Sequence, residues 1–225
     1  MTPVPARRAH RQRAGGRAVR ASRVGVFGGT FDPPHYGHLA LAEWARAELD
    51  LDQVLFVPAG LPPHKRRGEI SPARHRVAMT RLAVRGNPAF AVSTLETRRS
   101  GPSFTADTVC ALAAERQRSE LHLLMGADMF ATFDDWRRPE EIVSRAVLVI
   151  AMRPGVRRHQ SRWSRRGRGV VWLDNPGFEV SSRALRERAR AGLPLRYLVP
   201  EAVARYVIRH RLYRGRAGVT AAAGA

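Results

Sequence analysis

The sequence has almost no cysteine and almost no lysine. Cys110 is the only cysteine, which excludes an internal disulfide framework and a cysteine-based zinc cluster. We interpret it as a small buried hydrophobe in a helix. Lys65 is the only lysine, so arginine supplies the rest of the 39 basic residues. A composition rich in arginine and alanine can follow from GC-biased codon usage alone, and the formal charge of +20 is therefore a weak indication of function.

Acidic residues and long apolar runs are also scarce. The first 23 residues contain seven arginines and no carboxylate, so the charge without them falls from +20 to +13. This segment lacks the apolar core of a secretory signal, and no stretch approaches the roughly 20 apolar residues of a membrane span. We expect a cytoplasmic protein without a membrane partner, in which residues 1–22 form a disordered basic tail. An organelle transit peptide is the alternative for this tail.

The chain of 225 residues is long enough for one α/β domain, expected over residues 23–213 and followed by a disordered Ala/Gly tail at 214–225. Apolar runs predict strands, and helical spacing of apolar residues predicts helices. The expected strands are 24–27, 53–58, 90–97, 121–125, 146–151 and 170–173. The expected helices are 38–50, 71–85, 103–118, 127–136, 139–145, 182–191 and 200–210.

The alternation of strands and helices predicts βαβ units and a Rossmann-like, doubly wound, mostly parallel sheet with a small C-terminal helical part. Ser71 is expected to cap the second helix, with Pro72 at its first position. The arginine-rich stretch 156–169 is interpreted as a solvated loop. Because ligands of such sheets bind at the carboxyl ends of the strands, the loop after the first strand is the first place to look for a site.

That loop reads GGTFDPPHYGH over residues 28–38 and is rich in groups that bind anions. Gly28 and Gly29 let the backbone approach a phosphate closely, and their N–H groups and the Thr30 hydroxyl can donate to it. His35 and His38 lie three residues apart at an expected helix start, so both imidazoles can face one anion. The partial positive charge of a helix N-terminus favours the same anion. The loop therefore predicts a phosphate site.

The loop contains neither GxxxxGK followed by Ser or Thr nor GxGxxG, the two common glycine-rich nucleotide patterns. It resembles instead the GTFDP-x-H-x-G-H signature of the nucleotidylyltransferase superfamily. Over about residues 24–213 the chain is most similar to the bacterial nicotinate-nucleotide adenylyltransferases. The resemblance implies transfer of the adenylyl group of ATP to nicotinic acid mononucleotide in NAD biosynthesis, with Mg²⁺, release of pyrophosphate and no covalent enzyme intermediate. It places the loop residues, including Phe31, in the ATP site and makes His35 and His38 catalytic.

A second anion site is visible where Ser181 and Ser182 precede a helix and Arg186 lies one turn later. Hydroxyls, N–H groups and a guanidinium can meet one phosphate there, although in isolation the segment is also an ordinary helix cap. It resembles the superfamily's ISST-x-I-R element, which implies that these three residues bind ATP and that Arg186 is catalytic. The chain departs from that element at Arg183, where the family usually has threonine, and at Leu185 in place of isoleucine.

Choice of acceptor must come from the middle of the chain. Residues 101–108 resemble the family's Ser-(Tyr/Phe)-Thr-x-Asp-Thr segment, which implies that Thr105 contacts the pyridine carboxylate. Trp136 resembles a tryptophan that stacks on the pyridine ring, and core or surface packing is the alternative for it. The resemblance also implies acceptor contacts for Lys65 and Arg153. Asp128, in a Gly-x-Asp element, is expected to reach the ATP ribose, with a helix N-cap as its alternative.

Parts of the sequence are also compatible with other functions. A zinc site at the two histidines lacks a third ligand nearby, and no metal-ligating residue is expected. Phosphopantetheine adenylyltransferases have threonine in place of His35, and cytidylyltransferases lack the segments around Thr105 and Trp136. Nicotinamide mononucleotide as acceptor, a regulatory nucleotide binder without turnover and homo-oligomerisation stay open. Nucleic-acid binding is supported only by charge, since aromatic residues are not interleaved with the arginines, and we expect no nucleic-acid partner.

Overall fold

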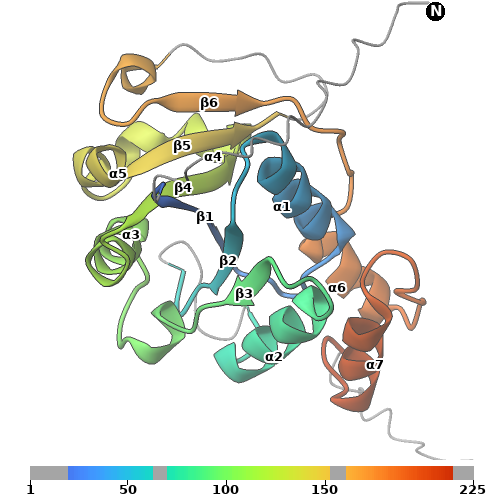
Figure 1. Ribbon diagram of the computed structural model, residues 1–225. Coiled ribbons are helices and arrows are strands. Elements are labelled where there is room, and N and C mark those ends of the chain that lie inside the picture. Colours follow the sequence, from blue (N-terminus) through green and yellow to red (C-terminus); the bar gives the residue numbers. More distant parts are fainter. Residues whose placement is uncertain (1–19, 63–69, 153–160, 215–225) are drawn as a thin grey trace, which may run out of the picture.

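The structure, a computed structural model, describes residues 20–62, 70–152 and 161–214 and contains one parallel sheet (Figure 1). The sheet order is β3-β2-β1-β4-β5-β6, and every neighbouring pair is parallel. The strands are β1 (Ser22–Gly29), β2 (Gln53–Pro58), β3 (Phe90–Val92), β4 (Ser119–Gly126), β5 (Ala146–Ala151) and β6 (Val170–Leu173). The doubly wound fold class is confirmed, and its order reverses between β1 and β4, where such sheets bind ligands.

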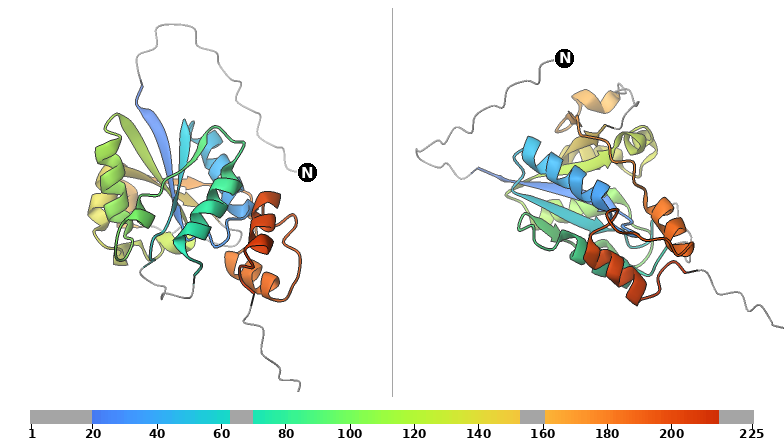
Figure 2. Two further views of the ribbon diagram at one scale, coloured as in Figure 1. Left: turned by 90° about the horizontal axis from the view of Figure 1, so that it is seen from below. Right: turned by 90° about the vertical axis from the view of Figure 1, so that its right-hand side faces the viewer.

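Helices follow the strands and cover both faces of the sheet (Figures 1 and 2). They are α1 (Tyr36–Glu48), α2 (Ala73–Val84), α3 (Thr105–Glu115), α4 (Ala127–Phe130), α5 (Pro139–Arg145), α6 (Ser182–Arg190) and α7 (Glu201–Arg209). Short 3-10 helices occur at η1 (Glu96–Arg98), η2 (Phe133–Asp135) and η3 (Arg162–Arg165). Of the predicted tails, 1–22 and 214–225, residues 1–19 and 215–225 lie outside the described part, and β1 already begins at Ser22.

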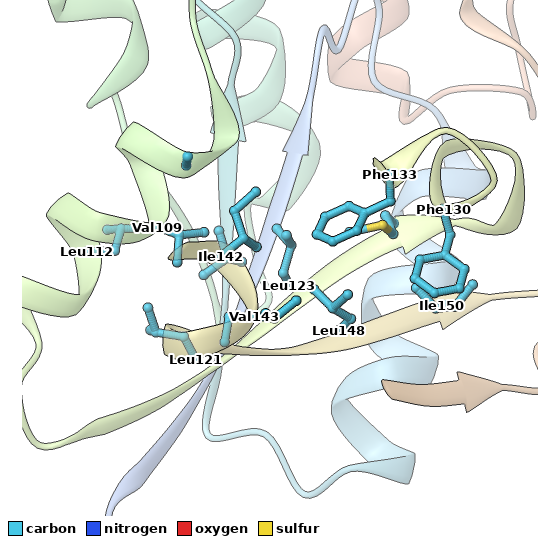
Figure 3. Close-up of a cluster of buried hydrophobic side chains, with 14 of the residues drawn as sticks. Val109, Leu112, Leu121, Leu123, Phe130, Phe133, Ile142, Val143, Leu148 and Ile150 are labelled. Carbon is cyan, nitrogen blue, oxygen red and sulfur yellow. The ribbon is translucent and has the colours of Figure 1, made fainter. Parts of the chain in front are cut away.

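The alternating side chains of the strands build two cores, one on each face of the sheet. On one face Leu121, Leu123 and Met125 of β4 pack with residues of α3 and α5, in the cluster drawn in Figure 3. On the other face Leu124 of β4 packs with Ala42 of α1. A third cluster joins α2, α6 and α7 and forms the C-terminal helical part, whose buried members are Met79, Ala83, Leu185, Leu195, Val199, Val203 and Val207.

Four local predictions were wrong because tertiary or side-chain contacts override local pattern. The strand expected at 90–97 ends at Val92, and side chains then bond the backbone nearby, as Thr97 Oγ1 does to Thr94 O over 3.0 Å. The helix expected at 127–136 splits into α4 and η2. Pro72, not Ser71, is the N-cap residue of α2, and its carbonyl accepts from the His75 N–H over 2.9 Å.

The fourth error concerns the arginine-rich stretch 156–169. Residues 153–160 lie outside the described part, but the remainder is not simply a solvated loop. Trp163 is only 1% exposed, and its indole N–H donates to Asp134 of η2. Its ring packs edge-on against Phe133 at 5.7 Å between centroids. Apolar burial of this one side chain attaches the stretch to the core.

Candidate active site

The loop after β1 is held to the core by an aromatic side chain. Phe31 has a positive φ of 50° and is 1% exposed, and its ring packs against Phe27 and Phe56 at 5.6 Å between centroids in each case. A Cβ at position 29 would lie 2.8 Å from the Phe31 ring, so only glycine fits there. The structure thus places Phe31 beneath the loop as a packing residue and leaves the polar groups of Gly28 and Thr30 at the strand end.

His35 and His38 meet at the start of α1. His35 is the N-cap residue, and the two rings stack with 3.7 Å between centroids and 28° between planes. The backbone N–H of His35 donates to Nδ1 of His38 over 3.2 Å. Nδ1 of His38 is therefore an acceptor, so in the neutral ring the hydrogen sits on Nε2. A Cβ at Gly37 would lie 3.1 Å from the His35 ring, so a glycine at this position leaves room for the ring.

The two predicted anion sites are adjacent in the structure although 149 residues separate them in sequence. The Ser182 hydroxyl donates to Pro33 O over 2.8 Å, and Arg186 Nη1 donates to Asp32 O over 2.8 Å. Ser181 is the N-cap residue of α6, and its Oγ accepts from Ala184 N–H over 3.2 Å. The N-terminus of α6 thus joins that of α1 at one loop, and both contribute partial positive charge there.

A layer of buried polar groups behind this loop was not predicted from the sequence. Asp32 is 0% exposed, and its carboxylate accepts from Ser71 N–H at 2.9 Å and from the Tyr213 hydroxyl at 2.7 Å. Burial raises the pKa of Tyr213 strongly, and the neighbouring Asp32 charge acts in the same direction. Arg76, also buried, donates to three backbone carbonyls. No local pattern marks these residues, since their partners come from distant segments.

The segments that hold Thr105 and Trp136 lie side by side. Thr105 is the first residue of α3, and Trp136 follows η2, with its ring 5.2 Å from that of Phe133. Two contacts join the segments: the Arg137 guanidinium lies over the Phe104 ring at 4.6 Å, and Arg138 pairs with the carboxylate of Asp107. Trp136 is half-buried, so one part of its ring packs on the core while the rest is accessible.

Asp128 follows β4, whose neighbour β1 leads into loop 28–38, so the two segments lie at the same edge of the sheet. Its side chain is exposed in α4 and turns back toward Gly126, where a Cβ would come within 2.4 Å of its carboxylate. Gly126, and not Asp128, is the N-cap residue of this short helix. Lys65 and Arg153 lie outside the described residues.

Among the described residues there is no group of three or more His, Cys, Asp or Glu side chains that could hold a metal ion. None of the helices in the described part is long and apolar enough to cross a membrane. Asp32, the acid within loop 28–38, is buried and accepts hydrogen bonds from Tyr213 and Ser71.

The chain is similar to known proteins over most of its length. The model of the cytidylyltransferase-like family matches residues 26–188. A relative from Symbiobacterium thermophilum, named "Probable nicotinate-nucleotide adenylyltransferase", is 46% identical over 198 residues, which cover 85% of this chain and 95% of the relative. One of the same name from Thermomicrobium roseum is 43% identical over 198 residues, covering 86% and 92%.

Solved structures are similar in fold at much lower identity. The Plasmodium falciparum nicotinic acid mononucleotide adenylyltransferase complexed with NaAD has a TM-score of 0.73 and 16% identity, covering 85% of this chain and 97% of that chain. A putative nicotinate-nucleotide adenylyltransferase from Vibrio parahaemolyticus has a TM-score of 0.63 and 18% identity, covering 86% and 96%. These two likenesses establish the fold.

Proposed function

The chain belongs to the nicotinate-nucleotide adenylyltransferases of the cytidylyltransferase-like family, and from this premise we propose that it transfers the adenylyl group of ATP to nicotinic acid mononucleotide. The products would be nicotinic acid adenine dinucleotide and pyrophosphate, in NAD biosynthesis. One structural observation supports the proposal most directly: the stacked His35 and His38 rings and the N-terminus of α6 meet at a single loop.

The reaction we propose is an in-line attack by the acceptor's 5′-phosphate oxygen on the α-phosphorus of ATP. A phosphate monoester is already anionic, so no strong general base is required, and the protein's task is to position the reactants and stabilise charge. His38 would donate from Nε2, since its Nδ1 is engaged by the His35 N–H. His35 and His38 would meet the α- and β-phosphates, while Ser181, Ser182 and Arg186 would hold the departing pyrophosphate.

We assign Mg²⁺ to this reaction as an ion bound mainly by ATP. The absence of a carboxylate cluster among the described residues fits a cation held through phosphate oxygens and water, as Mg²⁺ prefers in such sites. When bound with ATP, the ion would help to neutralise the charge that develops on the leaving pyrophosphate. The imidazoles and the guanidinium of Arg186 supply the protein's own share of that stabilisation.

The acceptor would bind where the segments of Thr105 and Trp136 lie side by side. The half-buried Trp136 ring can stack on a pyridine ring, and the N-terminus of α3, which begins at Thr105, offers backbone donors to a carboxylate. This donor set favours nicotinic acid mononucleotide over its amide. Lys65 and Arg153 are proposed as further acceptor contacts, and Asp128 as the contact to the ATP ribose. We place the enzyme in the cytoplasm.

Pyrophosphate release from ATP and Mg²⁺ tests the function, with each acceptor supplied in turn. We expect release with nicotinic acid mononucleotide, less with nicotinamide mononucleotide and none with phosphopantetheine. Release with phosphopantetheine and with neither pyridine mononucleotide would overturn the assignment. ATP-independent retention on nucleic acid that falls steeply with salt would instead favour a nucleic-acid-binding role.

A further inference from the structure

Arg76, in the first turns of α2, connects three separate segments through one side chain. Its Nε donates to Ser71 O at 2.9 Å, Nη1 to Thr30 O at 3.0 Å and Nη2 to Gly60 O at 2.8 Å. The residue is 1% exposed. The planar guanidinium holds these donors in a fixed fork, so the three carbonyl oxygens are held at fixed positions relative to one another.

A charged side chain at this depth is costly, and burial lowers the pKa of Arg76. The carboxylates of Asp32 and Glu96 oppose that effect, as does Tyr213. A well-packed apolar side chain of similar volume can stabilise a core as well as a buried ion does. The presence of a buried guanidinium is therefore better explained by the positions that it imposes on its three partners than by a gain in stability.

One of the three carbonyls that accept a hydrogen bond from Arg76 belongs to loop 28–38, the proposed ATP-binding loop. Thr30 directly follows Gly29 and β1, in the loop that carries the stacked histidines. Because Arg76 holds the Thr30 carbonyl from the buried side, it sets the position of the loop relative to the sheet. Ser71, whose carbonyl accepts from Arg76, attaches the same loop a second time, because its N–H donates to the Asp32 carboxylate.

The Gly60 carbonyl, a second hydrogen-bond partner of Arg76, leads to the segment that is proposed to bind nicotinic acid mononucleotide. The N–H of Gly60 donates to Ser103 Oγ over 3.0 Å, and the N–H of Ser103 donates to Leu61 O over 2.8 Å. Ser103 lies two residues before Thr105. A Cβ at Gly60 would lie 2.4 Å from Glu96 O, so the backbone passes too closely for any other residue. The bonded path runs from Thr30 through Arg76 and Gly60 to Ser103.

We infer that Arg76 is a positioning residue that sets the separation between the ATP-binding loop and the acceptor-binding segment. This inference rests on the proposed function, because it requires two substrates that react across the gap. In-line transfer needs the reacting atoms about 3–3.5 Å apart, and a misplacement of about 1 Å can cost 10²-fold in rate. Each substrate alone binds to its own segment, so its dissociation constant does not depend on the distance between the two segments.

The test compares binding with turnover in Arg76→Met, which keeps an apolar stem, and in Arg76→Lys, which keeps the charge without the fork. Dissociation constants for ATP and for nicotinic acid mononucleotide are measured separately by calorimetry, and kcat by pyrophosphate release. We expect each dissociation constant to change by less than about threefold and kcat to fall about 10²-fold in both variants. Retention of wild-type kcat in either variant would overturn the inference, as would loss of ATP affinity by the same factor as kcat.

Two further variants separate positioning from folding. Val203→Ala, in the buried α7 cluster far along the chain from the loop, loses packing without touching this path and is expected to keep wild-type kcat below its unfolding temperature. If Arg76→Met does not fold, Ser103→Ala cuts the same path at its other end, with an expected fall of several-fold in kcat at unchanged affinities. Unchanged kcat in Ser103→Ala, together with an unfolded Arg76→Met, would contradict the inference. A wild-type protein that forms no pyrophosphate would refute the proposed function instead.

Discussion

The hydroxyl of Tyr213 donates to the carboxylate of Asp32 over 2.7 Å, across 181 residues of sequence. Asp32 lies within loop 28–38, and Tyr213 follows the last described helix, α7. The same Tyr213 hydroxyl lies 3.8 Å from the sulfur of Met79 in α2. The C-terminal helical part is thereby attached to the back of the active site.

Tyr213→Phe removes this hydroxyl and keeps the ring. We expect the free energy of unfolding to fall by about 1–3 kcal/mol, since a buried carboxylate loses one hydrogen-bond donor. We also expect the KM for ATP to rise by less than about threefold, because the loop is less firmly held but keeps the Arg76 bond to Thr30. Urea denaturation and steady-state kinetics measure the two effects. Tyr206→Phe is the matched control, because its hydroxyl contacts His75 and not the loop; an equal rise in the KM for ATP there would contradict the explanation.

His38 has two separable roles, one for each ring nitrogen. His38→Ala removes both, whereas His38→Asn keeps an acceptor near the position of Nδ1 for the His35 N–H. We expect a loss of about 10²–10³ in kcat for both variants, because neither has the donor at Nε2. Thermal unfolding should show a smaller loss of stability for His38→Asn than for His38→Ala. Near-normal turnover in a folded His38→Ala would exclude the phosphate-binding role.

Asp107 holds the segment of Trp136 against α3 through Arg138. Asp107→Asn should raise the KM for the acceptor several-fold and leave the KM for ATP unchanged, because only the acceptor segment loses a charged contact. The effect on stability should be below about 1 kcal/mol, as for other partly exposed ion pairs. Glu201→Gln breaks the exposed pair with Arg205 on α7 and serves as control. A rise in the KM for ATP, with the KM for the acceptor unchanged, would contradict the assignment of this segment to acceptor binding.

His122, buried in β4, should make the protein less stable in acid. Burial lowers its pKa from the ordinary value of 6.5; Arg23 and Arg168 add to this effect, while Glu120 opposes it. Between the lowered pKa and 6.5 the unfolded chain binds more protons than the folded one, so stability falls as the pH drops below 6.5. His122→Gln should lose less stability than wild type over that window. Urea denaturation at several pH values measures both slopes, and parallel slopes would contradict the prediction.

Local sequence was sufficient wherever the controlling physics is local. Strands β2, β5 and β6 and helix α5 have the bounds that were predicted, because continuous apolar runs and a proline at the first helical position act within a few residues. Loop 28–38 could be predicted as an anion site for the same reason, since its glycines and histidines lie within one short segment. Where short-range side-chain bonds compete with a strand or helix, as after Val92 and Phe130, the predicted bounds were too long.

The sequence by itself determined the order of strands and helices and the family resemblance, and it predicts loop 28–38 as a phosphate site. Tertiary structure alone decided what supports that loop: the buried fork of Arg76, the bond from Tyr213 to Asp32, and the burial of Trp163 in a stretch that looked solvated. An arginine, a tyrosine or an aspartate has the same local propensity whether or not it is buried. Its hydrogen-bond partner is known only once packing has brought distant segments together.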